Sequence, residues 1–187
     1  MTIHITGDPA ADQVLSDDPF ALLVGMMLGQ QYPMEHAFRG PAKVLDRFGT
    51  LDPAAIAAAD PETFAALCTT PPAVHRFPGS MAGKIQDVAR IVVQEYDGDT
   101  ARLWTEATSG RDLLRRLQVL PGFGKQKSQI FVALVGKQLG VQPDGWREAA
   151  GNYGDEGAFR SVADVVGRDS LEQVRAFKKQ KKAAAKA

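Results

Sequence analysis

The chain has 187 residues, of which 44% are hydrophobic and 24% are charged, and its 22 basic and 22 acidic residues cancel to a net charge of zero. This composition is typical of one soluble globular domain, and no apolar run approaches the ~18 residues of a membrane span. The single cysteine, Cys68, excludes an internal disulfide and any zinc or iron–sulfur site built from several cysteines.

Helical patterns follow one another along the chain. Apolar residues recur at helical spacing, and Asp-Pro pairs mark several helix starts. Residues Ile130 to Val135 are apolar all round, so the helix that contains them should be buried. No strand pattern competes, and the sequence therefore predicts an all-α protein. The predicted helices lie at 17–31, 34–49 (with a kink at Gly40-Pro41), 52–60, 60–68, 80–98, 109–120, 125–140, 157–167 and 170–180.

Positive charge is concentrated in two parts of the chain. The tail, residues 175–187, holds six basic residues and no acid, and without these six the body has 16 basic residues against 22 acidic ones. Within this acidic body, residues 111–137 hold six basic residues against one acid, Asp112. Such concentrations of cations attract a polyanion. We expect the tail to be disordered, and it either solubilises the protein or adds nonspecific phosphate contacts.

The stretch LPGFGK, residues 120–125, interrupts two predicted helices. Gly122 and Gly124 allow positive φ angles and have no Cβ to obstruct a ligand that approaches the backbone. The free N–H groups and the dipole at the start of the second helix favour an anion, and Lys125 and Lys127 add positive charge beside it. The pattern predicts a phosphate-binding turn, and an ordinary turn between two helices is the alternative.

This stretch resembles the helix-hairpin-helix signature of the HhH-GPD superfamily of DNA glycosylases, which includes endonuclease III and the alkyladenine-type enzymes. PFALLVGMMLGQQ is similar to a family helix that ends in a glutamine near DNA, and GSMAGKIQDVARIV is similar to the helix with a lysine that precedes the hairpin. The resemblance runs from about Pro19 to Trp146. It implies two helical lobes with an active-site cleft between them, in a domain of residues 1–174 with its hairpin at 112–139.

The resemblance also implies which residues contact DNA. Gln31 (or Gln30) would approach the duplex from the first lobe, and a monovalent cation can accompany the hairpin. A flipped base would stack on aromatic residues, for which Tyr32, Phe77 and Trp146 are candidates, with a core or surface role as the alternative for each. From the hairpin, the DNA contacts would come from Gly122, Phe123, Gly124, Lys125 and Lys127.

An aspartate essential for catalysis lies some twenty residues beyond the hairpin in this family. Asp144 stands twenty residues after Gly124, in a Pro/Gly loop. A carboxylate beneath the sugar stabilises the positive charge that develops there as the base leaves. The resemblance therefore assigns catalysis to Asp144, although Pro-Asp-Gly is also a common surface turn.

A second position decides the type of reaction. Bifunctional members carry a lysine two residues after the second hairpin glycine, and this lysine attacks C1′ of the sugar. Gln126 stands at that position. Lys125 and Lys127 are rotated from it by ~100° about the helix axis, so they should face the DNA backbone, although a shift of one residue would restore the lysine.

The sequence therefore predicts a monofunctional DNA N-glycosylase of base excision repair. We expect a monomer that acts on double-stranded DNA containing a damaged base, without a cofactor or an iron–sulfur cluster and away from membranes. A noncatalytic helix-hairpin-helix DNA-binding protein is the alternative. Since the N-terminus lacks the basic-then-apolar pattern of a secretory signal, we expect the protein in the cytoplasm with the nucleoid.

Overall fold

The structure is a computed structural model that describes residues 2–186, and over these residues it contains helices and loops but no strand. The all-α prediction is confirmed. The helices are α1 (Pro9–Asp17), α2 (Pro19–Met27), α3 (Met34–Ala37), α4 (Gly40–Phe48), α5 (Pro53–Ala58), α6 (Pro61–Thr69), α7 (Pro78–Tyr96), α8 (Arg102–Thr105), α9 (Gly110–Gln118), α10 (Lys125–Gln138), α11 (Trp146–Ala150), the 3-10 helices η1 (Gly151–Gly154) and η2 (Val162–Asp164), and α12 (Arg168–Lys186).

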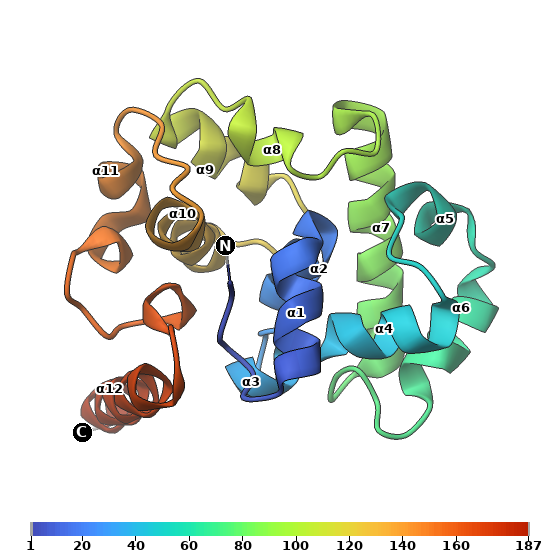
Figure 1. Cartoon of the computed structure of the whole chain (residues 1–187), viewed down its shortest axis with the longest axis horizontal. Helices are drawn as coiled ribbons and strands as arrows, with labels where there is room; N and C mark the ends of the chain where they lie inside the picture. Colours follow the sequence, from blue (N-terminus) through green and yellow to red (C-terminus); the bar gives the residue numbers. More distant parts are fainter. Residues whose placement is uncertain (1, 187) are drawn as a thin grey trace.

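The helices form two groups that meet at α2 and α10. Figure 1 shows α4 to α7 on one side of α1 and α2, and α9 to α12 on the other side. Every residue of α2 from Phe20 to Met27 is buried, and so is every residue of α10 from Phe131 to Gly136. These two apolar segments form the centre of the core because neither has a polar face to turn toward water.

The helix starts follow local capping chemistry. Asp18, Asp52 and Asp60 each accept a hydrogen bond from a backbone N–H in the first turn of the helix that follows, and a proline opens each of these helices. The stretch 34–49 is divided into α3 and α4 just before Pro41, as the expected kink requires.

The helix α1 was not predicted, because the N-terminal stretch reads as polar. Asp8 caps it by accepting from the N–H of Ala10, and Pro9 stands at its first position. One face buries Ala11 and Leu15. Asp12 on the same face is buried as well, and its Oδ1 accepts hydrogen bonds from the N–H groups of residues 5 and 6 and from the hydroxyl of residue 6. Asp12 therefore holds residues 5 and 6 against α1.

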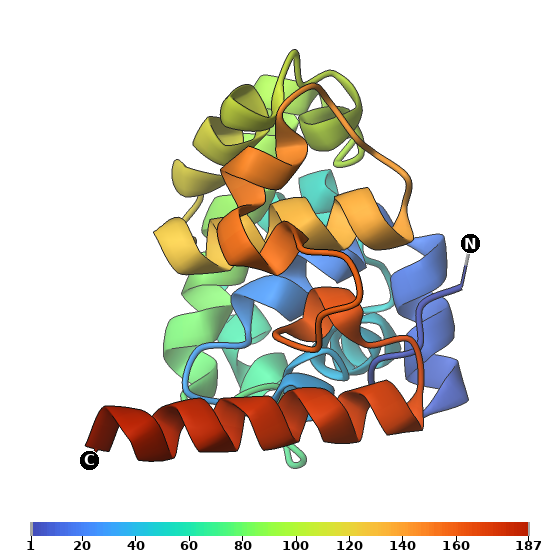
Figure 2. The ribbon, with the colours of Figure 1, turned by 90° about the vertical axis from the view of Figure 1, so that its left-hand side faces the viewer.

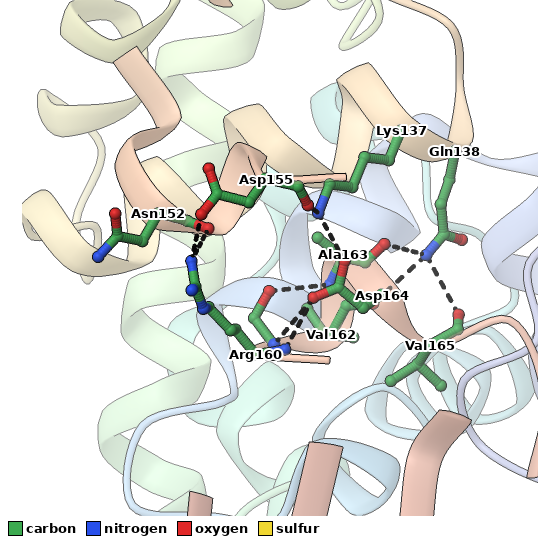
Figure 3. Close-up of polar contacts among 10 residues, drawn as sticks. Lys137, Gln138, Asn152, Asp155, Arg160, Val162, Ala163, Asp164 and Val165 are labelled. Atoms are coloured by element: carbon green, nitrogen blue, oxygen red, sulfur yellow. Dashed lines mark hydrogen bonds and ion pairs between the residues drawn. The ribbon is translucent and has the colours of Figure 1, made fainter. Parts of the chain in front are cut away.

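The helix predicted at 157–167 is wrong, since this segment is a loop with only the short η2. Ser161 and Asp164 form a capping box around η2. Lys137 of α10 bonds to the Asp164 carboxylate at 2.6 Å, and Gln138 donates to three carbonyl oxygens of residues 162–165 (Figure 3). These contacts give the loop's polar groups partners without a helix, so tertiary structure overrides the local pattern.

The basic tail differs from the expectation of disorder, because α12 continues to Lys186. Leu171, Val174 and Phe177 form an apolar stripe at helical spacing, of which Val174 is fully buried. Arg175 forms an ion pair with the nearly buried Glu35 beside α3, and the alanines at 183–185 favour helix. Figure 2 shows α12 as one straight helix whose last turns extend past the body of the molecule.

Candidate nucleic-acid interface

The hairpin consists of α9, a turn of residues 119–124, and α10. Ser109 caps α9 by accepting from the N–H of Asp112. Within the turn, the N–H of Leu120 donates to Leu117 and the N–H of Phe123 donates to Leu120. The ring of Phe123 is buried and packs edge-on against another core ring, with 6.3 Å between the ring centres. Of the residues expected to contact DNA, Phe123 can therefore do so only through its backbone.

The two hairpin glycines have different reasons to be glycine. Gly122 has a φ of +81°, and a Cβ there would lie 3.1 Å from the side chain of Met27, so the fold itself requires a glycine. Gly124 has a φ of −76°, it is exposed, and a Cβ there would meet nothing within 4 Å. Gly124 also begins α10 without a side-chain cap. The space before the positive end of α10 is thus open to an external anion.

The lysines beside Gln126 point in different directions. Lys125 is exposed next to the open turn. The ammonium of Lys127 instead donates to the backbone oxygen of Met27 at 2.8 Å. Burial, together with the charge of Lys84, lowers the pKa of Lys127 to about 8. Lys127 therefore faces the interior of the cleft, whereas the sequence predicts that it faces the DNA backbone.

A cavity of about 220 Å³, room for one nucleobase, opens between the two groups of helices. The loop from α2 to α3, the first turns of α10, η1 with its following loop, and α12 form its walls. Gln126 lies in the wall and donates a hydrogen bond to the hydroxyl of Tyr153. We call the apolar part of the lining the floor and the polar part the rim. The floor consists of Met26, Gly29, Met34, Phe38, Ile130, Val162 and Phe177, and the rim consists of Tyr32, Gln126, Lys127, Tyr153, Arg160, Lys178 and Lys181.

The rim of this cavity is positively charged. Arg160 is neutralised by Asp155 at 2.6 Å and also donates to the backbone oxygen of Asn152 (Figure 3). Among the described residues, no salt bridge involves the other three cations of the rim, and no carboxylate lines the cavity. Burial also lowers the pKa of Lys178, which lies at the mouth on α12. The cavity therefore suits a ligand that accepts hydrogen bonds and carries no positive charge.

The structure does not bring Asp144 to this cavity. Its backbone oxygen accepts from the N–H of Gly110 at the start of α9, and its side chain is exposed. Trp146 packs against Gly136, which follows Gln126 by ten residues, or ~15 Å along α10. In Figure 2 the loop after α10 rises away from α12 toward α11. Because α10 continues to Gln138, only a short loop remains, and it ends beside the far half of the helix.

The aromatic residues predicted to stack on a base do not all lie at the cavity. Tyr32 lines the cavity. Trp146 is buried against α10, with Arg147 over its ring at 4.6 Å, and it does not line this cavity. Phe77 is half exposed outside the cavity, near Arg76. Gln31 lies exposed in the loop from α2 to α3 with a φ of 53°, and it borders a neighbouring groove that also contains Arg76. Of the three predicted aromatic residues, Tyr32 alone lines the cavity, and the lining also contains Phe38, Tyr153 and Phe177, which were not predicted.

His75 contributes to the site by supporting Tyr32. The N–H of Phe77 donates to its Nδ1, so the proton lies on Nε2, which is 2.9 Å from the backbone oxygen of Gln30. Its ring lies 4.8 Å from that of Tyr32. Burial lowers the pKa of this histidine and keeps it neutral. His75 thus joins two loops and supports Tyr32, a role that no local sequence pattern indicates.

Within residues 2–186, no three side chains of histidine, cysteine, aspartate or glutamate are arranged to hold a metal ion. In the same part of the chain, no helix combines the length and apolar character that crossing a membrane requires. Comparison with curated proteins and with solved structures gives no match. Comparison with protein families matches residues 24–187 to the family described as HhH-GPD superfamily base excision DNA repair protein. Both the hairpin and the cavity lie within the matched residues, and the chain therefore belongs to the HhH-GPD superfamily of base excision DNA repair proteins.

Proposed function

We propose that the protein is a monofunctional DNA N-glycosylase, which hydrolyses the bond between a damaged base and its sugar in duplex DNA. The observation that carries this proposal is that the residues at the start of α10 belong to two surfaces. Gly124 and Lys125 face outward at the open turn, while Gln126 and Lys127 line a cavity of nucleobase size. A strand bound at the turn would have its backbone next to the mouth of the cavity, where a flipped base could enter.

The charges around this site fit a DNA backbone. A phosphate at the start of α10 would meet free N–H groups and the ammonium of Lys125. The start of α10 and the last turns of α12 lie on the same side of the molecule (Figure 2), so the lysines of α12 can add phosphate contacts. Among the described residues the carbonyl oxygens of Pro121 and Gly122 accept no hydrogen bond, which leaves acceptors for the monovalent cation that the family resemblance implies.

Hydrolysis without strand cleavage follows from the residue at position 126. A glutamine cannot form a Schiff base with the sugar, and its amide is already bonded to Tyr153. We propose that water is the nucleophile and that an abasic site is the product. We also propose that the protein acts as a monomer on DNA in the cytoplasm.

The test is a panel of duplexes that each contain one deaminated, oxidised or alkylated base. Free base is measured by chromatography, and abasic sites are detected by strand breakage in alkali. Release of one base with breakage only after alkali supports the proposal. Strand breakage without alkali would contradict the monofunctional assignment.

The second candidate is a noncatalytic protein that binds damaged DNA. The observation that favours it is the position of Asp144, at the far end of α10 from a cavity that has no carboxylate in its lining. Catalysis by Asp144 is implied by the family resemblance alone, and a sugar bound at this cavity would not reach its carboxylate. Preferential binding to one lesion duplex, with no base released on prolonged incubation, would establish this second function in place of the first.

A further inference from the structure

Three ammonium groups, those of Lys127, Lys178 and Lys181, border one small cavity, and among the described residues no carboxylate offsets them. The nearest ion pair, between Arg160 and Asp155, is closed within itself at 2.6 Å. The remaining polar groups are uncharged, and they are two tyrosine hydroxyls and the Gln126 amide. Charges of one sign around a cavity act together on whatever enters it, even where water partly screens each of them.

Damaged bases differ in charge in a way that this rim can distinguish. A purine alkylated on a ring nitrogen, such as 7-methylguanine, carries a positive charge, and the ammonium groups would repel it. Deaminated or oxidised bases, such as uracil, are neutral and have carbonyl oxygens that accept hydrogen bonds. When the glycosidic bond of such a base breaks, the electron pair stays on the base nitrogen, so the departing base is an anion.

We propose that this cavity selects uncharged, carbonyl-rich bases over positively charged alkylated bases. The role in catalysis rests on the proposed glycosylase function. In the glycosylase reaction, the lysines stabilise the negative charge of the departing base. The protein then stabilises the transition state through the base and not through the positive charge of the sugar. The C1′–N bond breaks and its electron pair goes to the base. The water oxygen bonds to C1′, and the proton lost from water is taken up by the base.

The geometry of the lysines supports this assignment. Lys127 is held in place by the Met27 carbonyl oxygen at 2.8 Å, so its charge stays at the cavity without an acidic partner. Lys127 is half-buried, and Lys178 and Lys181 are exposed at the mouth of the cavity. Lys178 and Lys181 come from α12, one helical turn apart on the same face. The apolar floor, which includes Met26 and Phe38, gives a base a surface to lie on.

The experiment measures binding separately from hydrolysis. Duplexes carry a single 2′-fluoro-arabino nucleotide, which resists hydrolysis, with either uracil or 7-methylguanine as its base. Affinities are measured by fluorescence anisotropy relative to an undamaged duplex. We expect a preference of about fivefold or more for the uracil duplex, as a partly desolvated charge implies.

Two double variants test which lysines cause the preference for the uracil duplex. In Lys178→Gln/Lys181→Gln the preference should fall toward one. Lys179→Gln/Lys186→Gln removes the same charge from α12 at positions that are equally exposed but do not line the cavity. In this variant the preference should persist even if both affinities decrease. Equal or tighter binding of the 7-methylguanine duplex by the natural protein, or an unchanged preference in the first variant, would overturn the inference.

Hydrolysable duplexes separate this inference from the proposed function. Release of uracil faster than of 7-methylguanine supports both. Faster release of 7-methylguanine keeps the glycosylase function and overturns the selectivity. A binding preference for uracil that depends on Lys178 and Lys181, with no base released from any duplex, keeps the selectivity and overturns the glycosylase function.

Discussion

The side-chain amide of Gln126 donates a hydrogen bond of 2.9 Å to the hydroxyl of Tyr153, and this contact closes the wall of the cavity between α10 and η1. The two residues are 27 positions apart in the chain. Gln126 stands where bifunctional relatives are expected to carry a lysine. The position of its side chain therefore indicates where the amine of such a lysine would lie.

Gln126→Lys should create a lyase activity. An amine at this position would lie in the cavity wall and could form a Schiff base with the aldehyde of an abasic site. Borohydride should then trap a covalent complex between the variant and an abasic duplex, and it should trap none with the natural protein. A complex trapped with the natural protein, and lost in Lys127→Gln, would show that Lys127 is a nucleophile.

Substitution of the two hairpin glycines should separate folding from DNA binding. Gly122→Ala should lower the free energy of unfolding by roughly 1–2 kcal/mol, because alanine is strained at a φ of +81°. Gly124→Glu should change stability by less than about 1 kcal/mol, since a side chain there meets open space. It should weaken duplex binding on the order of tenfold, regardless of sequence. Urea unfolding and anisotropy measure the two effects.

The matched control for Gly124→Glu is Gly167→Glu, because a Cβ at Gly167 also meets nothing within 4 Å and lies outside the hairpin. It adds the same charge and should leave affinity nearly unchanged. If both variants bind DNA equally, the open turn is not the contact.

Asp144→Asn should retain most of the base release, within about threefold of the natural protein, because its carboxylate does not line the cavity. Single-turnover rates on the best lesion duplex measure this. A loss of a hundredfold or more, as expected for a group that stabilises the transition state, would mean that the reacting sugar binds beside Asp144 and not at this cavity.

Stability should depend on pH through His75. Burial lowers the pKa of His75 from its ordinary value of 6.5, so the unfolded chain takes up a proton at a higher pH than the folded chain does. The contribution is therefore fully present above pH 6.5 and is lost as pH falls from 6.5 toward the folded pKa. Urea unfolding is measured between about pH 7.5 and 5.5, roughly one unit on either side of the ordinary pKa. Over this range the free energy of unfolding should fall more steeply for the natural protein than for His75→Gln. Identical slopes would contradict the assignment of a neutral, buried ring.

Local signals in the sequence determined much of this fold. The Asp-Pro starts of α2, α5 and α6 were predicted because capping depends on residues two or three positions apart. The hairpin was predicted because Gly122 needs a conformation that only glycine adopts easily. Burial of α10 was predicted because it has no polar face from Phe131 to Gly136.

Tertiary structure decided where the candidate site lies. The family resemblance, with the spacing from Gly124, assigned catalysis to Asp144. The structure continues α10 to Gln138 and packs Trp146 against Gly136, so the loop that holds Asp144 lies beside the far half of this helix. The composition of the tail indicated disorder, yet Val174 and the ion pair of Arg175 fix α12 against the body, where Lys178 and Lys181 reach the cavity. The sequence alone determined most of the longer helices and the hairpin, because their signals act over a few residues. The cavity and its charge were decided by contacts between residues up to 140 positions apart, which no local pattern encodes.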